Sequence, residues 1–411
     1  MNHEYIAILG RQPKLGLAEL EALYGDGVGV LTENVVKITT EPELARLGGA
    51  KKIGRVIGGG GEKDIFDLCK NYITPLRGKI TVGFSAFNSH FTPRELQNFG
   101  IRLKKAAKLS GQSIRVVPNQ TTELSTATSF HNKLGTTPNK IEFLLVETGR
   151  KILIAALTQT QNINHYRDRD QKRPYRDAFV GMLPPKLAQI MINLATDGQD
   201  PAGKTLLDPF CGTGVILQEA LLMGTKAYGT DISEKMVNYS EQNLTWLTKK
   251  LKNHFQVAEK ICNPLRAVRV TRGGAAPKNV FAPFFSVCLG DATSFQWQQP
   301  IDFVTSETYL GQPFSAPPSD QKLRQVATTT QKIFLAFLKN LAPQIKPNTP
   351  LCLAIPAWKR QDGTFFHLKI LDLLNGLGYN VISFKHVGQK DLLYFRESQV
   401  VARELLVLRR K

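Results

Sequence analysis

Three aspartates that follow short apolar segments are the residues of this chain best placed to bind a small ligand. Asp208 follows KTLL, Asp231 follows KAYGT, and Asp291 follows SVCLG. Each apolar segment is typical of a buried strand, and open α/β folds bind ligands at the carboxyl edge of their parallel strands. A single aspartate in such a place is more often a helix cap. Three of them at successive strand ends predict a binding site.

The loop around the first aspartate has the sequence DPFCGTG, residues 208–214. Its glycines, Gly212 and Gly214, allow a tight turn and a close approach of the backbone to a ligand. The loop is neither the GxGxxG of dinucleotide sites nor a GK[ST] phosphate loop. We therefore expect a ligand without phosphates, with a cationic amino-acid end near Asp208. Asp231 can accept hydrogen bonds from two ribose hydroxyls, and Asp291 can receive an adenine amino group.

Helices and strands alternate along the chain from about residue 183, which predicts a parallel sheet covered on both faces. The fold class that we expect is therefore α/β, with a Rossmann-like domain over 181–411. Its last segment, 392–410, is expected to close the sheet as an antiparallel hairpin. An irregular basic stretch at 249–285 is expected to be an insertion.

The chain before this domain is expected to be α+β, in two parts. An N-terminal domain covers 1–75, in which Gly58 to Gly61 form a break, and a compact RNA-binding fold covers 76–161. A charged segment at 162–180 is expected to be a linker, in which internal ion pairs and RNA contact are equally plausible. The residues that we expect to contact RNA lie on a helix at 94–111 and in this linker: Arg102, Lys104, Lys105, Lys108 and Arg173.

The formal net charge of +19 favours a polyanionic partner, because neutralising phosphates releases counterions. The five cysteines are scattered without a CxxC pair, which fits a reducing, cytoplasmic setting and no zinc ribbon. No His or Cys spacing suggests a metal site. The beginning of the chain does not have the pattern of a secretory signal, and no apolar run is long enough to span a membrane.

The DPFCGTG loop resembles the first motif of class I S-adenosylmethionine-dependent methyltransferases, and its residues are those typical of the amino-methylating branch. Three further segments are similar to the THUMP-domain tRNA methyltransferases of archaea and eukaryotes that modify guanosine at tRNA position ten: YIAILGRQPKLGLAELEAL, QTQNINHYRDRDQKRPYRDAFVGMLPPKLAQIMINLA and YFRESQVVARELLVL. The resemblance implies S-adenosylmethionine as cofactor, tRNA as partner and a THUMP-like domain over 76–161. It places the cofactor against ten residues: Asp208, Pro209, Phe210, Cys211, Gly212, Gly214, Asp231, Ile232, Asp291 and Ala292.

The catalytic motif of that family, Asp-Pro-Pro-Tyr-Gly after the fourth strand, is altered in this chain. The corresponding segment is IDFVTSETYLGQPF, in which Ser306 replaces the aspartate and Tyr309 is retained. By the resemblance, Tyr309 would stack on a flipped base, and Glu307 or Ser306 would orient its exocyclic amine, guanosine N2. Two alternatives remain open, a DNA amino-methyltransferase and an RNA-binding protein derived from an enzyme but weakened in catalysis.

Overall fold

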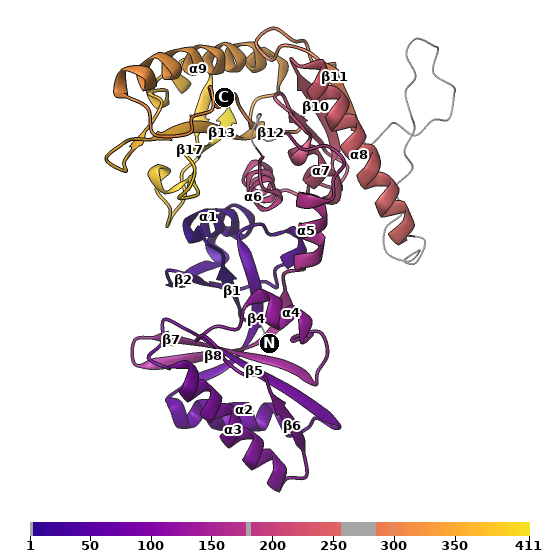
Figure 1. The fold of residues 1–411 in the computed structure, drawn as a ribbon, viewed down its shortest axis with the longest axis vertical. Helices are drawn as coiled ribbons and strands as arrows, with labels where there is room; N and C mark the ends of the chain where they lie inside the picture. Colours follow the sequence, from indigo (N-terminus) through magenta and orange to yellow (C-terminus); the bar gives the residue numbers. More distant parts are fainter. Residues whose placement is uncertain (1–2, 178–181, 256–284, 299) are drawn as a thin grey trace. The chain divides into compact units, whose positions relative to one another are not determined.

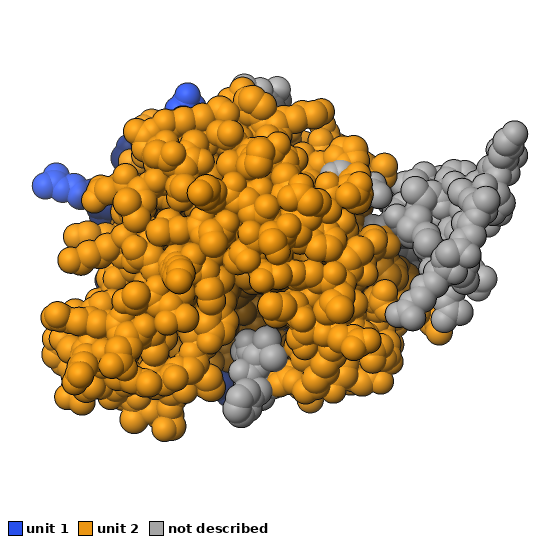
Figure 2. Space-filling view, turned by 90° about the horizontal axis from the view of Figure 1, so that it is seen from above, with its two compact units in different colours: residues 1–166 blue, residues 167–411 orange. Residues whose placement is uncertain are grey.

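The computed structural model describes residues 3–177, 182–255, 285–298 and 300–411. The chain divides into two compact units, residues 1–166 and 167–411 (Figures 1 and 2). Each unit is built on its own β-sheet. The two are described separately below.

Unit 1 contains one eight-stranded sheet in the order β2-β3-β1-β4-β8-β7-β5-β6. Strand β5 runs parallel to both of its neighbours, β6 and β7, and the other neighbours are antiparallel. The strands are β1 (Tyr5–Leu9), β2 (Val28–Thr32), β3 (Val35–Ile38), β4 (Ala50–Gly60), β5 (Lys79–Phe87), β6 (Ser113–Val116), β7 (Lys140–Thr148) and β8 (Lys151–Thr160). Because β4 pairs with both β1 and β8, the expected parts 1–75 and 76–161 share a continuous sheet.

Two helices of unit 1, α2 (Glu62–Ile73) and α3 (Pro93–Leu109), pack in one apolar cluster with β5, β7 and β8 (Figure 1). The remaining helices of this unit are α1 (Pro13–Tyr24) and α4 (Thr126–His131). Helix α3 begins where its sequence predicts. Thr92 accepts a hydrogen bond from the Glu95 amide at 3.2 Å, and the Glu95 carboxylate accepts one from the Thr92 amide at 2.7 Å. This reciprocal cap satisfies two donors of the first turn.

The four-glycine break expected at 58–61 is wrong, because strand β4 continues through Gly60. Gly59 and Gly60 pair with Leu153 and Ile152 of β8 after a register shift near Gly58. A Cβ atom on Gly58 would lie 2.8 Å from Leu68 of α2, and one on Gly60 would lie 2.5 Å from Asp64. The glycines therefore mark a bulge and the close packing of α2 on the strand.

Unit 2 contains a nine-stranded sheet whose main path is β11-β10-β9-β12-β13-β17-β15. The first five strands of this path are parallel, and β17 is antiparallel to both neighbours. In chain order the parallel strands run 3-2-1-4-5, the order of a doubly wound Rossmann-like sheet, which confirms the expected fold. The strands are β9 (Thr205–Asp208), β10 (Lys226–Asp231), β11 (Phe285–Leu289), β12 (Phe303–Glu307), β13 (Pro350–Lys359), β14 (Phe365–Phe366), β15 (Tyr379–Val381), β16 (Leu393–Tyr394) and β17 (Val401–Arg410).

The long helix α9 (Asp320–Leu341) packs on the sheet of unit 2 through one apolar cluster. Its Phe334, Phe337 and Leu338 contact a layer to which Leu207 of β9 and Val304 of β12 belong. Three more helices also pack on this sheet: α6 (Pro185–Thr196), α7 (Val215–Leu222) and α8 (Glu234–Phe255). Helix α7 contacts both α6 and α8, and the three helices together contact the strands from β9 to β13. Helix α10 (Leu371–Leu374) contacts β15.

The segment expected to be a linker contains a helix, α5 (Ile163–Gln171). Asp168 forms ion pairs with Lys172 and Lys250 at 2.8 Å and 2.7 Å, and Arg169 binds Glu219 of α7 at 2.7 Å. The mixed charges of this segment therefore serve internal ion pairs.

The expected closing hairpin is confirmed only in part. Strand β16 pairs with β17 over two residues, whereas the main partner of β17 is β13, over nine residues. The expected insertion at 249–285 lies mostly outside the described residues. None of the helices within the described ranges is long and apolar enough to cross a membrane.

Candidate active site

The glycine loop after β9 turns tightly and lies against helix α8. Gly212 and Gly214 have φ angles of 50° and 79°, in the left-handed region that favours glycine. Gly214 is also the N-cap of α7. A Cβ atom on Gly214 would lie 2.3 Å from the hydroxyl oxygen of Ser240 in α8. Any side chain at this position would therefore push α7 and α8 apart.

Asp231, at the end of β10, holds this loop in place. One of its carboxylate oxygens accepts a hydrogen bond from the Gly212 amide at 2.9 Å, and the other accepts one from the Ser233 amide at 2.9 Å. Burial raises the pKa of Asp231, and the two backbone hydrogen bonds oppose that rise. The next residue, Ile232, is an exposed apolar side chain with 73% of its surface accessible. An apolar surface beside a fixed carboxylate suits a nucleoside, whose base is apolar on its faces and whose ribose carries hydroxyls.

The three aspartates follow neighbouring strands, because β11, β10 and β9 are adjacent in the sheet. Asp291 is exposed, and its Oδ1 accepts hydrogen bonds from the Thr293 amide and hydroxyl at 2.9 Å and 2.8 Å. Ala292 is buried directly after it. Asp208, by contrast, is only 1% exposed. Parallel pairing therefore brings all three residues to one edge of the sheet, as the sequence predicts.

These residues fit an adenosyl amino acid. Asp231 and Ile232 offer a ribose acceptor and an apolar surface, and the loop at Gly212 and Gly214 leaves room that a Cβ would fill. The other expected contacts belong to the same loop. Cys211 donates its amide hydrogen to the Thr230 carbonyl at 2.9 Å, Pro209 accepts a hydrogen bond from the Thr230 hydroxyl at 3.1 Å, and Phe210 packs edge-on against Phe337. No group of His, Cys, Asp or Glu side chains in the described part of the chain could hold a metal ion.

Ser306, which stands where the family has its catalytic aspartate, is fully buried and binds Asp208. Its hydroxyl donates a hydrogen bond to Oδ1 of Asp208 at 2.6 Å, between the neighbouring strands β12 and β9. Burial raises the pKa of Asp208 to about 8, although the bonds from Ser306 and the Phe210 amide act in the opposite direction. Burial therefore favours the protonated form of the Asp208 carboxyl group. A nearby cation would favour its ionisation.

Glu307, the other candidate for the amine contact, is engaged in an ion pair that the sequence analysis missed. Its Oε1 accepts a hydrogen bond from Nε of Arg403 in β17 at 2.5 Å. The two side chains are 14% and 5% exposed. The carboxylate that Glu307 was expected to offer to an amine is thus already bound to a guanidinium.

Tyr309 faces solvent, with 45% of its surface accessible. Two residues later Gly311 has a φ of 83°. A Cβ atom on Gly311 would lie 2.8 Å from Val326 of α9 and 3.4 Å from the Thr330 hydroxyl oxygen. Glycine at this position therefore lets the loop lie directly on α9, with Tyr309 exposed beside it.

The basic residues expected to contact RNA fall into two groups. Arg102, Lys104, Lys105 and Lys108 are all exposed on α3, opposite its buried apolar face. Arg173 differs, because its side chain is only 3% exposed. Burial lowers its pKa, and the charges of Asp170 and Glu219 oppose this. Arg173 as placed in this structure therefore cannot contact RNA, which corrects the expectation.

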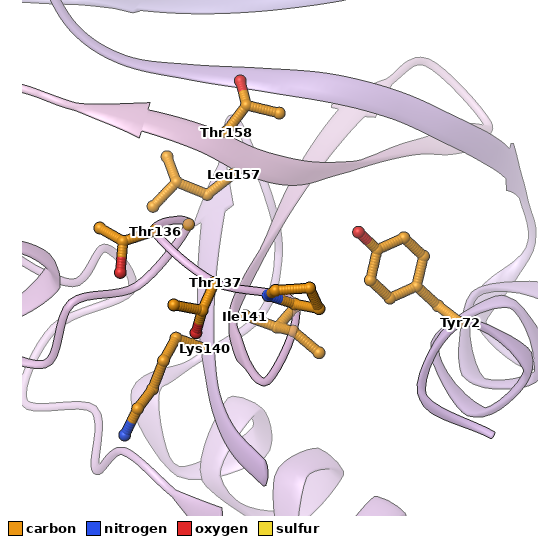
Figure 3. A pocket seen from close by; sticks show the side chains of 9 residues that line it. Tyr72, Thr136, Thr137, Lys140, Ile141, Leu157 and Thr158 are labelled. Carbon is orange, nitrogen blue, oxygen red and sulfur yellow. The ribbon is translucent and has the colours of Figure 1, made fainter. Parts of the chain in front are cut away.

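Unit 1 also contains a pocket of about 250 Å³, toward which Tyr72 points from α2 (Figure 3). Three of its polar side chains form hydrogen bonds within the protein. Lys140 donates to the Thr81 hydroxyl at 3.2 Å, Thr158 to the Ile53 carbonyl at 3.2 Å, and Thr136 to the Lys133 carbonyl at 2.7 Å.

Comparison with known proteins gives three kinds of similarity. A family model described as "DNA methylase" matches residues 70–242, less than half of the chain. A protein of Methanothermobacter thermautotrophicus named tRNA (guanine(10)-N2)-dimethyltransferase is 28% identical over 189 residues, which are 46% of this chain and 43% of the relative. A Pyrococcus abyssi protein of the same name is 28% identical over 251 residues, 59% of this chain and 67% of the relative.

The crystal structure of TrmN from Thermus thermophilus is 16% identical, with a TM-score of 0.49 and complete coverage of both chains. The match to the Methanothermobacter protein spans less than half of that relative's length, and the match to the Pyrococcus protein spans about two thirds. The chain is thus a homologue, at modest identity, of proteins named tRNA (guanine(10)-N2)-dimethyltransferase.

Proposed function

We propose that this protein is an S-adenosylmethionine-dependent methyltransferase that modifies an exocyclic amine of a base in tRNA, guanosine N2. The observation that carries the proposal is the edge of the unit 2 sheet. There Asp208, Asp231 and Asp291 follow three adjacent strands around a tight glycine loop. The names of the homologues supply the substrate class.

In this proposal unit 1 holds the RNA. The exposed basic face of α3, with Arg102, Lys104, Lys105 and Lys108, neutralises phosphates, and the region 76–161 acts as a THUMP-like domain. The high net charge supports a polyanionic partner. A cytoplasmic location, expected from the scattered cysteines, stays a prediction.

The cofactor supplies an electrophilic methyl group on a sulfonium. An amine nitrogen that accepts this methyl group would release one proton to water and leave S-adenosylhomocysteine. Tyr309 stacks on the flipped base, and Asp231 fixes the ribose. The protein therefore acts mainly by positioning the nitrogen and the methyl group and by excluding water.

The Ser306 hydroxyl contributes by holding Asp208, and Glu307 by holding Arg403. The first contact connects β12, which carries the base-binding loop, to the neighbouring strand β9. The second connects β12 to β17. In this assignment they are positioning residues, which keep the loop rigid although it lacks the prolines of the family motif.

The experiment that tests the proposal is methyl transfer from S-adenosylmethionine with a labelled methyl group to unmodified tRNA, followed by mass spectrometry of the nucleosides. We expect N2-methylated guanosine with the full chain and little product with Asp231→Ala. A wild-type protein that binds the cofactor but labels no tRNA would contradict the proposal.

Two other functions are each supported by one observation. The family model described as "DNA methylase" favours a DNA amino-methyltransferase, and label in DNA but not in tRNA would establish it. The occupied side chains of Ser306 and Glu307 favour an RNA-binding protein with weakened catalysis. Tight tRNA binding without any transferred methyl group would identify that case.

A further inference from the structure

A small pocket of about 190 Å³ lies between the loop after β12 and the first half of α9. Tyr309 and Gln312 line it from the loop, and Lys322, Gln325 and Thr330 line it from the helix. It therefore begins at the exposed tyrosine on which the proposed function stacks a base. A base stacked on Tyr309 would present one of its edges to this pocket.

Thr330 sets this pocket apart from ordinary surface, because its hydroxyl is buried without a partner. Thr330 is 1% exposed, and its Oγ1 has no hydrogen-bond partner among the described residues. Threonines inside helices commonly donate to the carbonyl four residues earlier. Thr328 and Thr329 do so, to the carbonyls of Arg324 and Gln325 at 2.8 Å and 3.4 Å. Thr330 departs from this pattern, and it is one of the residues that line the pocket.

The polar side chains of the pocket share one chemical property, since each carries a hydrogen-bond donor. Lys322 has an ammonium group, Gln312 and Gln325 have amide NH₂ groups, and Tyr309 and Thr330 have hydroxyls. No carboxylate lines it. The amides and hydroxyls can also accept, but Lys322 can only donate and therefore favours an acceptor. Guanine offers the O6 and N7 acceptors, whereas adenine offers N7 and a donating N6 amine.

We propose that this pocket binds the O6/N7 edge of the target guanine, with Thr330 and Gln325 as residues that determine specificity. The inference rests on the proposed function and deepens it. It assigns recognition of the base to α9, at a site where the loop acid is bound to Arg403 and the loop serine to Asp208. An unpaired buried hydroxyl discriminates well, because the wrong ligand leaves it without a partner.

The test compares two tRNA substrates in single-turnover methyl transfer by the full chain. One carries the target guanosine, and the other carries 2,6-diaminopurine there, which keeps the reacting N2 amine but replaces the O6 acceptor with an amine and the N1–H donor with an acceptor. The pocket variants then show which part of the preference comes from α9. We expect wild type to prefer guanosine at least about tenfold, the value of one hydrogen bond. Thr330→Val and Gln325→Ala should slow the guanosine reaction about tenfold and reduce the preference, while Thr330→Ser should retain both.

Matched controls lie on the same helix. Thr328→Val and Gln331→Ala change the same side-chain types outside the pocket and should leave rate and preference unchanged. Thermal melts check folding, and we expect Thr330→Val to melt no lower than wild type, because it removes an unpaired buried hydroxyl.

The inference is overturned if the wild type methylates tRNA but Thr330→Val and Gln325→Ala keep both its rate and its preference for guanosine. It is also overturned if wild type accepts both substrates equally. A wild type that transfers no methyl group to tRNA would instead contradict the proposed function itself, so the two failures have different readouts.

Discussion

The ion pair between Glu307 and Arg403 leads to a prediction that separates a structural role from a catalytic one. Oε1 of Glu307 and Nε of Arg403 are 2.5 Å apart, and both side chains are largely buried. Glu307→Gln would leave the Arg403 guanidinium buried without a counter-charge. Removing one partner of a buried pair costs roughly 3–5 kcal/mol. For a unit of this size, that corresponds to a melting temperature about 10 °C lower.

The assay combines thermal melting with single-turnover methyl transfer at a temperature where every variant is folded. We expect Glu307→Gln and Arg403→Met each to lower the melting temperature, and the Glu307→Leu/Arg403→Met double variant to recover much of the loss, because a buried pair can be replaced by apolar side chains at little net cost. The coupling between the two sites is obtained from the double-mutant cycle of Glu307→Leu, Arg403→Met and the double variant.

A more exposed ion pair in the same unit provides the control. Arg360 and Asp320 are 3.8 Å apart and are 36% and 58% exposed. Asp320→Asn should cost no more than about 1 kcal/mol, as is usual for surface pairs. If Glu307→Gln instead melts like wild type and loses turnover, then the reasoning is refuted, and Glu307 acts on the amine directly.

Three further predictions follow from the site and from α3. Asp231→Ala should weaken S-adenosylmethionine binding by about one to two orders of magnitude in calorimetry, because it removes a charged acceptor worth about 1.5–3 kcal/mol; unchanged affinity would place the ribose elsewhere. Asp208 has a pKa raised to about 8, so the folded protein retains a proton that the unfolded chain releases near its ordinary pKa of 3.8, and this stabilisation is lost as the pH rises toward 8. Asp208→Asn should therefore reduce the fall in melting temperature between about pH 5 and pH 8, and an unaltered slope would contradict this. Replacing Arg102, Lys104 and Lys105 with alanine should weaken tRNA binding and flatten its salt dependence by about one unit of slope for each phosphate that is no longer neutralised; an unchanged slope would move the RNA footprint away from α3.

The parts of the fold that were predictable are those with a local signal. The alternation of helical and apolar segments predicts the parallel strands of unit 2, and the 79–87 segment predicts β5 to the residue. Glycine and charge were less reliable guides. The glycines at 58–60 accommodate a bulge and a helix that packs on the strand. The charged segment after 162 forms α5, because its acids and bases find partners on α7 and α8.

In the candidate site, too, some features could be predicted from the sequence and others could not. The place of the three aspartates follows from parallel pairing, which aligns the ends of successive strands. The partners of Ser306 and Glu307 do not follow, because Asp208 and Arg403 lie 98 and 96 residues away in the sequence. Thr330 gave a weaker signal still. Only the packing of the Gly311 loop on α9 distinguishes it from the two threonines before it.

The altered loop after β12 and the pocket beside it both bear on how a base amine could be held in place. A family motif with a free aspartate and two prolines offers the amine an acceptor on a stiff turn. In this chain the serine and the glutamate of the loop are bound to Asp208 and Arg403, so stiffness comes from contacts between strands, and the loop itself offers no free acid. Recognition must then come from elsewhere, and the donors of α9 lie next to Tyr309. We therefore expect variants of the ion pair to lose stability and variants of the pocket to lose the preference for guanine, each without the other.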